Sequence, residues 1–119
     1  MDKLAGKTIL VIEDEYLVAL MAADMLQAMG ATVRGPVATL ADGLAQTEDD
    51  GIDAVVLDAN LRGESSAPIA EQLHRRGTPF ILATGYGAHE VAERYGVPVV
   101  NKPYSDSALG QALQEALAG

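Results

Sequence analysis

The sequence predicts a doubly wound α/β fold, in which helices cover both faces of a five-stranded parallel sheet. Its 119 residues suit one domain, and a content of 49% apolar but only 4% aromatic residues suits helices packed on a sheet. Short β-branched runs also alternate with helical stretches, and this alternation requires crossover connections between parallel strands. We therefore expect a single domain over residues 1–119, with the strands in the order 2-1-3-4-5.

Five short apolar runs predict the strands. They cover residues 8–12, 32–35, 52–57, 80–84 and 97–100. The first, third and fourth runs are almost wholly apolar, as expected of strands that are buried on both faces of a sheet. The second run is short and is followed by Pro36, so it predicts a weak strand.

Capping residues and apolar residues at three- and four-residue spacing predict the helices. In the helix expected over 16–29, the spaced residues are Leu17, Leu20, Met21 and Met25, and Gly30 stands at the C-cap position. Three further helices are expected over 40–50, 68–76 and 88–95. A last helix follows the capping residue Ser105, with an apolar side of Leu109, Leu113, Ala116 and Leu117.

The chain is acidic, with 8 Lys and Arg against 17 Asp and Glu and a formal net charge of −9. This charge repels nucleic-acid phosphates and anionic lipid headgroups, so we expect neither nucleic acid nor membrane as a partner. The absence of cysteine excludes disulfides, thiol nucleophiles and cysteine-based zinc sites. No apolar run is long enough for a signal peptide or a membrane span, and a soluble, cytoplasmic protein is expected.

Polar side chains stand where the predicted strands end. Glu13 and Asp14 follow the first strand, Asp58 follows the third, and Thr84 and Lys102 stand at the ends of the fourth and fifth. Neighbouring parallel strands lie roughly 4.8 Å apart, so the three acids should share one pocket. Close carboxylates repel one another unless a proton or a cation neutralises them, and a site of carboxylate oxygens suits Mg²⁺.

A purely structural role is the alternative for each of these residues. An acid that follows a strand can cap the next helix and is stabilised by the helix dipole, which explains Glu13 or Asp14 equally well when each is taken alone. It explains Asp58 less well, because a polar loop follows this residue. The presence of Lys102 at the same edge of the sheet favours a shared site over separate caps.

Four segments together carry a resemblance to a known family. They are residues 11–15 (VIEDE), 56–61 (VLDANL), 83–85 (ATG) and 102–104 (KPY). In this order, each at a strand end, they resemble the receiver domain of the bacterial two-component response regulators, over about residues 7–117. The resemblance implies a flavodoxin-like receiver fold that fills the chain and leaves no room for an output domain.

The resemblance also implies the chemistry of the site. Asp58 would accept a phosphoryl group from a histidine kinase or phosphotransfer protein in a Mg²⁺-dependent reaction. Lys102 would pair with one phosphoryl oxygen, and Thr84 would donate its hydroxyl to another. The implied metal ligands are Asp14 and Asp58, Glu13 directly or through water, and the backbone carbonyl of Asn60.

Further properties are implied by the family. Lys102 and Pro103 would be joined by a cis peptide, and Gly85 would leave space over the acceptor. Asn60 and Tyr86 stand at the variable positions that tune the lifetime of the phosphoryl group. Without an output domain the protein would act through an unidentified downstream protein or as a phosphate shuttle or sink, and we expect no enzymatic turnover.

Two positions depart from the usual receiver pattern. Val99 stands where most receivers carry an aromatic switch residue, and Arg62 stands where many carry proline. With residues 82–87 (LATGYG), these departures resemble the FATGUY subgroup, although Leu82 replaces the leading phenylalanine. Members of that subgroup are mostly single domains and are often linked with histidine kinases of the HWE type. One of the tyrosines is expected to take over part of the switch, and the candidates are Tyr86, Tyr95 and Tyr104.

Two other functions are compatible with an acidic site or with a sheet of this kind. A Mg²⁺-dependent phosphohydrolase with Asp58 as nucleophile would need Asp-x-Asp after the first strand, whereas this chain has the sequence DAN after the third. A flavin mononucleotide carrier would need a phosphate-binding loop where the acids Glu13 and Asp14 would repel the phosphate. His74 and His89 are predicted to be solvated helix residues away from the strand ends.

Overall fold

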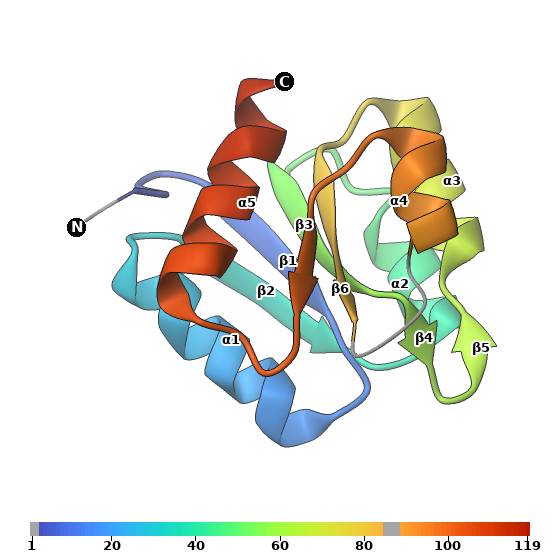
Figure 1. Ribbon diagram of the computed structural model, residues 1–119, viewed down its shortest axis with the longest axis horizontal. Coiled ribbons are helices and arrows are strands. Elements are labelled where there is room, and N and C mark those ends of the chain that lie inside the picture. The colour runs from blue at the N-terminus through green and yellow to red at the C-terminus, as the bar shows by residue number, and fades with distance from the viewer. Residues whose placement is uncertain (1–2, 85–88) are drawn as a thin grey trace.

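The computed structural model describes residues 3–84 and 89–119, which form a parallel sheet between two layers of helices (Figure 1). The strands lie in the order β2-β1-β3-β6-β7, and each neighbouring pair is parallel. Their bounds are β1 Thr8–Ile12, β2 Thr32–Val37, β3 Ala54–Asp58, β6 Phe80–Thr84 and β7 Val99–Asn101. The predicted fold class and the predicted strand order are therefore confirmed.

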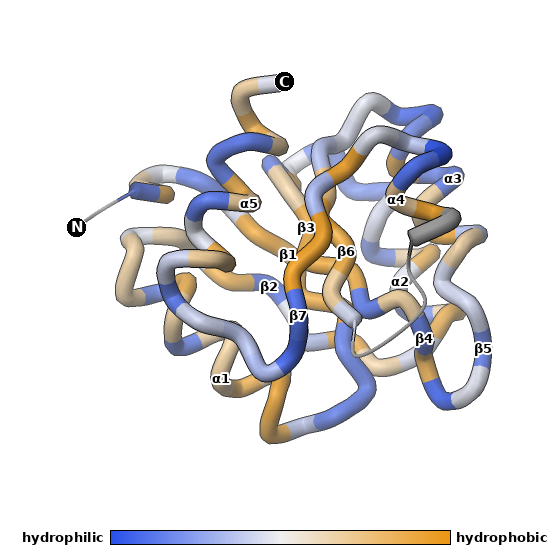
Figure 2. Tube along the Cα trace, viewed as in Figure 1, coloured by the Kyte–Doolittle hydropathy of each residue, from blue (hydrophilic) through white to orange (hydrophobic). Residues whose placement is uncertain are grey.

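The helices divide between the two faces of the sheet (Figure 1). Helices α1 (Tyr16–Ala28) and α5 (Asp106–Ala118) cover one face, and α2 (Leu40–Gln46), α3 (Ala67–Arg76) and α4 (His89–Tyr95) cover the other. Because side chains alternate along a strand, Val11 and Val56 belong to the apolar cluster under α1 and α5, whereas Leu10 and Leu57 belong to the opposite one. Figure 2 shows the resulting apolar centre, with hydrophilic residues towards the outside.

Local signals explain several of the helix ends. The Thr39 side chain accepts a hydrogen bond from the Asp42 N–H at the start of α2, and the Ser105 side chain accepts one from the Ala108 N–H at the start of α5. Gly77 ends α3 with φ of +71°, a conformation that favours glycine. In α5 the predicted side faces the core, since Leu109 and Leu113 are fully buried.

The second helix is shorter than predicted. It ends at Gln46 instead of continuing to residue 50, because the polar residues that follow make their own local hydrogen bonds. The Thr47 hydroxyl donates to the Gly43 carbonyl oxygen, and Asp49 accepts from the Gly51 N–H. The strand after it begins at Ala54 instead of residue 52 and includes Asp58, so the acceptor candidate is the last residue of β3. The strand expected over 97–100 is Val99–Asn101.

The edge strand β2 is longer than predicted and includes a cis peptide between Gly35 and Pro36. Gly35 has φ of +86°, and a Cβ at this position would lie 2.8 Å from the carbonyl oxygen of Val11. Only glycine therefore lets β2 approach β1 this closely.

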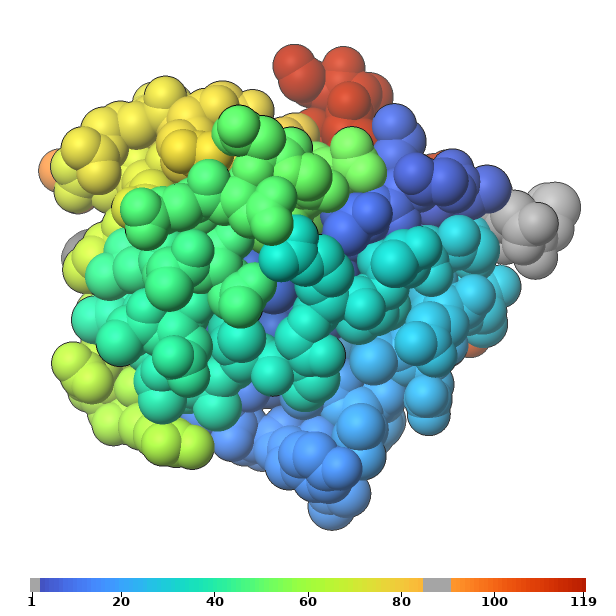
Figure 3. Space-filling model, turned by 180° about the vertical axis from the view of Figure 1, so that it is seen from behind, coloured from blue at the N-terminus to red at the C-terminus, as the bar shows by residue number. Residues whose placement is uncertain are grey.

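The segment 59–66, predicted as a loop, contains a small hairpin. Strand β4 (Asn60–Leu61) pairs antiparallel with β5 (Glu64–Ser65), separately from the main sheet. The hairpin projects at a corner of the molecule, at lower right in Figure 1 and at lower left in the reverse view of Figure 3. Two-residue strands have no hydrophobic periodicity, which explains why the sequence pattern did not reveal them.

The face of helix α1 that packs against the core is not the face predicted from its large apolar residues. Leu17 is 73% exposed, and Leu20 and Met21 are also exposed, whereas Ala19, Ala22 and Leu26 are buried against the sheet. The helix itself was predicted correctly, but Ala19 and Ala22 face inward whereas Leu17, Leu20 and Met21 face outward. Among the described residues, none of the helices is both long and apolar enough to cross a membrane.

Candidate functional site

The carboxyl ends of the strands bring four distant segments together, at the lower side of Figure 1. Glu13 directly follows β1, Asp58 ends β3, Thr84 ends β6, and Lys102 directly follows β7. Ile12 pairs with Leu57, which sets Glu13 beside Asp58, and Thr84 pairs with Asn101. The backbone N–H of Lys102 donates to the Thr84 carbonyl oxygen at 3.2 Å. The register of the parallel sheet thus builds the site.

One ammonium group faces three carboxylates in this site. Lys102 Nζ lies 3.1 Å from Glu13 Oε1, 3.2 Å from Asp58 Oδ2 and 3.5 Å from Glu15 Oε1. Glu13 is 2% and Asp58 4% exposed, so these charges are largely removed from water. Glu15 was not predicted as a site residue, although its charge stands beside the two predicted acids in the sequence.

The acids also form a group that could hold a metal ion. One carboxylate oxygen from each of Glu13, Asp14 and Asp58 can be chosen so that all three lie within 4.8 Å of one another. Three hard oxygen donors, with a single nearby lysine to balance them, fit the preference of Mg²⁺ for carboxylates. The geometry thus places the three predicted acids at one point.

The electrostatics of the pocket reflect this crowding. Burial raises the pKa of Glu13 to about 8, and the neighbouring Asp58 carboxyl adds to the shift. Burial also raises the pKa of Asp58, although hydrogen bonds from Glu13, from the Asn60 N–H and from Lys102 act in the opposite direction. Burial alone would lower the pKa of Lys102, but its hydrogen bond to Glu13 and the nearby negative charges raise the pKa above its usual value. A cation is favoured here because it would relieve the repulsion among the carboxylates.

A backbone N–H of the β4–β5 hairpin forms a hydrogen bond with Asp14. The Arg62 N–H donates to Asp14 Oδ2 at 2.8 Å, and this bond lowers the pKa of Asp14 although burial opposes the shift. Arg62 has φ of +52°, in the left-handed region that residues other than glycine rarely adopt. The Asn60 side chain accepts from the Gly63 N–H at 2.9 Å, and this bond stabilises the turn of the hairpin. Asn60 was predicted as a metal ligand through its carbonyl and as a position that tunes the phosphoryl lifetime, whereas the connection between Arg62 and Asp14 was not predicted.

A hollow of about 630 Å³ opens over the acids. Besides residues of the strand ends, Glu15 and Val18 of the α1 segment and Pro103 line it. The peptide between Lys102 and Pro103 is cis, as expected from the resemblance. Gly85, which was expected to leave space over the acceptor, and Tyr86, which was expected to tune the lifetime of the phosphoryl group, fall outside the described residues, as does the side chain of His89.

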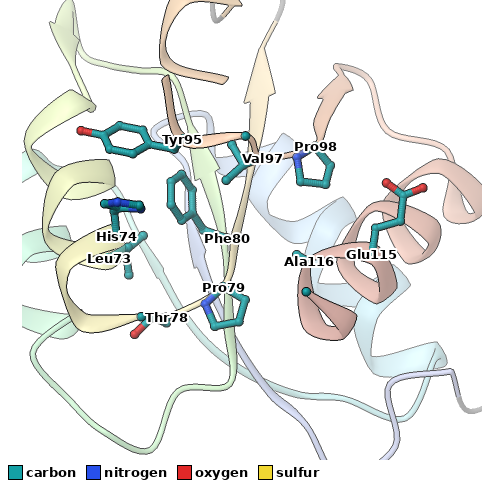
Figure 4. Close-up of a pocket in the computed structure, with 13 residues that line it drawn as sticks. Leu73, His74, Thr78, Pro79, Phe80, Tyr95, Val97, Pro98, Glu115 and Ala116 are labelled. Atoms are coloured by element: carbon teal, nitrogen blue, oxygen red, sulfur yellow. The ribbon is translucent and has the colours of Figure 1, made fainter. Parts of the chain in front are cut away.

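A second hollow, of about 650 Å³, lies at the opposite end of the strands (Figure 4). Its wall contains the ring of Tyr95, which is 4.9 Å from the ring of His74 and 6.1 Å from that of Phe80, measured between centroids. His74 is thus away from the acids, as predicted. This hollow contains no cluster of acids, so Tyr95 takes part in aromatic packing remote from the candidate site.

The chain belongs to the response regulator receiver domain family, because the family model matches residues 9–114. Receiver domains of two-component systems take phosphoryl groups from histidine kinases or phosphotransfer proteins, bind Mg²⁺ at an acidic pocket, and are generally non-enzymatic signalling domains. The Glu13, Asp14 and Asp58 group fits such a pocket.

Individual solved structures agree with this assignment. The chain is 44% identical to SdrG from Sphingomonas melonis Fr1, with 100% of both chains covered and a TM-score of 0.84 in the solution structure. It is 42% identical to the BeF3-activated conformation of SdrG from Pseudomonas melonis Fr1, covering 96% of this chain and 98% of that one with a TM-score of 0.77.

A third structure shares the fold. The receiver domain of sensor histidine kinase PA1611 from Pseudomonas aeruginosa PAO1 has a magnesium ion coordinated in its active site cleft. It is 24% identical, covers 97% of this chain and 100% of that one, and has a TM-score of 0.82. The comparison with curated proteins gives no match.

Proposed function

We propose that Asp58 accepts a phosphoryl group from a phosphohistidine of a histidine kinase or phosphotransfer protein. The observation that carries the proposal is the position of Asp58, whose Oδ2 lies 3.2 Å from the Lys102 ammonium at the base of an open acidic hollow. The transfer forms a bond between a carboxylate oxygen of Asp58 and phosphorus. It breaks the bond from phosphorus to the donor nitrogen, and the electron pair of that bond stays with the imidazole.

The residues around Asp58 support a specific division of roles. Glu13, Asp14, Asp58 and the carbonyl of Asn60 would hold Mg²⁺, which when bound neutralises negative charge on the phosphoryl oxygens. Lys102 is a compact cation that can turn from the carboxylates to a phosphoryl oxygen. Thr84 lines the same hollow, from which its hydroxyl can donate to another phosphoryl oxygen.

The exposed face of α1 supports a protein as the phosphoryl donor. Tyr16, Leu17, Leu20 and Met21 form an apolar surface on this helix, and Glu15 and Val18 of the same segment line the hollow. A donor that brings its phosphohistidine to the hollow must contact the adjoining surface, and exposed apolar patches are typical of protein interfaces. We propose that the donor protein docks on this face of α1.

The output follows from the same proposal. The chain would act on an unidentified downstream protein through its phosphorylation state, or serve as a phosphate shuttle or sink, in the cytoplasm and without contact to nucleic acid or membrane. Membership of the FATGUY subgroup and a kinase of the HWE type stay predictions, which rest on the sequence around residues 82–87.

Phosphorylation can be tested directly with acetyl phosphate and Mg²⁺. Intact mass measurement should show one added phosphoryl group on the wild type and none on Asp58→Asn. Asp24→Asn removes an exposed acid of α1 with the same change of charge and should be labelled normally. Labelling of Asp58→Asn would overturn the assignment, and many turnovers of the donor without accumulation of labelled protein would favour the phosphohydrolase alternative.

Metal binding and donor docking need separate measurements. Mg²⁺ titration followed by NMR should show strongly weakened binding for Asp14→Ala and unchanged binding for Asp24→Ala, and equal affinities would overturn the ligand assignment. Leu17→Ser should leave labelling by acetyl phosphate unchanged and slow labelling by a histidine kinase that labels the wild type. Equal slowing with both donors would exclude a docking role.

A further inference from the structure

Glu15 brings a carboxylate to the acidic hollow that does not belong to the metal-binding group. The oxygens that converge within 4.8 Å of one another come from Glu13, Asp14 and Asp58. Glu15 lines the same hollow, and its side chain is 64% exposed, whereas the side chain of Asp58 is buried at the base. The Glu15 carboxylate therefore lies towards the mouth of the hollow.

The backbone of Glu15 is fixed, and its side chain turns to the hollow. Its N–H donates to Glu13 Oε2 at 3.1 Å, and its carbonyl oxygen accepts from the Ala19 N–H at 2.9 Å. Glu15 is the N-cap residue of α1, but within the described part of the chain its side chain makes no capping hydrogen bond. The Oε1 atom lies instead 3.5 Å from Lys102 Nζ. Capping of the helix therefore does not explain the direction of this carboxylate.

The contact between Glu15 and Lys102 is also easily given up. At 3.5 Å it is longer than the 3.1 and 3.2 Å contacts of Lys102 with Glu13 and Asp58, and longer than an ordinary N–H···O hydrogen bond. When Lys102 turns to a phosphoryl oxygen, the exposed Glu15 carboxylate is left free to accept a hydrogen bond from an incoming molecule.

The leaving group of the phosphoryl donor is the part that meets this carboxylate. In-line transfer places the leaving group on the side of phosphorus opposite the Asp58 oxygen, and thus towards the mouth of the hollow. A donor docked on the exposed Tyr16 and Leu17, which follow Glu15 in the chain, would enter from the same side.

The two classes of phosphoryl donor present opposite charges at this point. In phosphohistidine the leaving group is an imidazole ring, whose second nitrogen can carry a proton and donate it in a hydrogen bond to a carboxylate. In an acyl phosphate such as acetyl phosphate the leaving group is a carboxylate, which the negative charge of Glu15 repels.

We propose that Glu15 is a specificity-determining residue that selects N-phosphorylated imidazoles over acyl phosphates as phosphoryl donors. This inference rests on the proposed function, because it requires transfer to Asp58. Glu15 accepts a hydrogen bond from the N–H of the donor's second ring nitrogen while the bond from phosphorus to the first nitrogen breaks. The electron pair of that bond stays on the first nitrogen and the proton stays on the second, so the ring leaves as neutral imidazole and Glu15 takes no proton.

The test compares two small donors that have no protein surface, phosphoimidazole and acetyl phosphate, each with Mg²⁺. Intact mass measurement gives the rate of labelling for the wild type and for Glu15→Gln, which removes the charge and keeps the size of the side chain. The rate with phosphoimidazole should fall about fivefold, the effect of one exposed hydrogen bond to a charged group. The rate with acetyl phosphate should rise about twofold because a repulsive charge is lost, and added salt should reduce this rise.

Glu115→Gln is the matched control. Glu115 is an exposed acid that lines the hollow at the opposite end of the strands (Figure 4), and its substitution makes the same change of charge. Both labelling rates of Glu115→Gln should equal those of the wild type.

Opposite changes with the two donors separate selection of the donor from a merely structural role, which would move both rates in the same direction. An unchanged ratio of the two rates in Glu15→Gln, or a ratio shifted towards phosphoimidazole, would overturn the inference and leave the labelling of Asp58 intact. Failure of both donors to label the wild type would overturn the proposed function as well.

Discussion

The two ends of the parallel sheet carry hollows of similar size and opposite chemistry. At the carboxyl end, about 630 Å³ is lined by acids, Thr84 and Lys102. At the amino end, about 650 Å³ lies between α3, α4 and α5, where Phe80 and Tyr95 pack against His74 (Figure 4). The two hollows differ little in volume. They differ because charged groups converge on the hollow at the carboxyl end.

The difference shows how the fold separates stability from chemistry. The amino end uses aromatic contacts that favour the folded state and that have no acid cluster to bind a metal. At the carboxyl end, repulsion among the gathered carboxylates destabilises the folded state. Binding of a cation or transfer of a phosphoryl group changes this balance of charges. Substitutions at the two ends should therefore affect stability and binding in different ways.

The largest difference is expected from removal of one cation at each end. Lys102→Met leaves Glu13 and Asp58 buried without their ammonium partner and should lower the free energy of unfolding by about 3 kcal/mol in the metal-free protein. Arg76→Met, at the end of α3, removes only an ion pair to the exposed Asp50 and a bond to a backbone oxygen, and should cost about 0.5 kcal/mol. Urea unfolding measures both, and equal losses would contradict the contrast between the ends.

The pH dependence of stability should be dominated by the carboxyl end. The pKa of Glu13 rises from 4.5 to about 8 on folding, so the folded state binds a proton in this range that the unfolded state releases. Its contribution is fully present below about pH 4.5 and is lost as the pH rises through about 8. The pKa of Asp14 is lowered instead, and its contribution is lost only as the pH falls below about 4.

The metal-free protein should therefore lose roughly 3 to 4 kcal/mol of stability between about pH 5 and about pH 8. Urea midpoints measured across this range should fall with pH in the wild type and stay nearly level in Glu13→Gln. Saturating Mg²⁺ should reduce the slope, because the metal competes with the proton for the same oxygens. A wild-type midpoint that rises with pH would contradict the assigned role of Glu13.

A substitution in the aromatic packing should affect only stability. Phe80 is buried beside Tyr95, and Phe80→Leu should lower the free energy of unfolding by about 1.5 kcal/mol through lost volume and ring contact. The Mg²⁺ affinity, measured by NMR titration, should equal that of the wild type. A weakened affinity would mean that the two ends are coupled through the sheet.

The smallest expected effect lies in the hairpin beside the acids. Arg62→Val places a β-branched residue at φ of +52° and should cost about 1 kcal/mol, whereas Arg62→Asn, which tolerates this conformation, should cost little. Because the N–H at this position orients Asp14, the valine variant should also bind Mg²⁺ a few-fold more weakly. Equal Mg²⁺ affinities for both variants would show that the hairpin does not position the ligand.

Much of this molecule follows from short-range patterns. The strands β1, β3 and β6 are continuous apolar runs, and each ends at or beside a polar residue that stands out in the sequence. Once the alternation of strands and helices predicts a parallel sheet, the strand order brings Glu13, Asp14 and Asp58 to one edge. The acid group could be predicted for this reason, without any knowledge of side-chain positions.

Contacts between segments far apart in the chain could not be predicted in this way. The inward face of α1 depends on how closely the helix approaches the sheet, which selects Ala19 and Ala22 for the core instead of the larger Leu17. The hairpin bond from Arg62 to Asp14 joins residues separated by 48 positions and depends on a turn that lacks any periodic signal.

The sequence by itself determined the order of the strands, the positions of the acids at their ends, and the formal net charge of −9. Only the tertiary structure decided which groups satisfy one another there: Lys102 lies among three carboxylates, and the Arg62 N–H donates to Asp14 Oδ2. The physical reason is the range over which each kind of interaction acts. Periodicity and capping act over a few residues, whereas hydrogen bonds and charges depend on ångström distances that exist only after the sheet has formed.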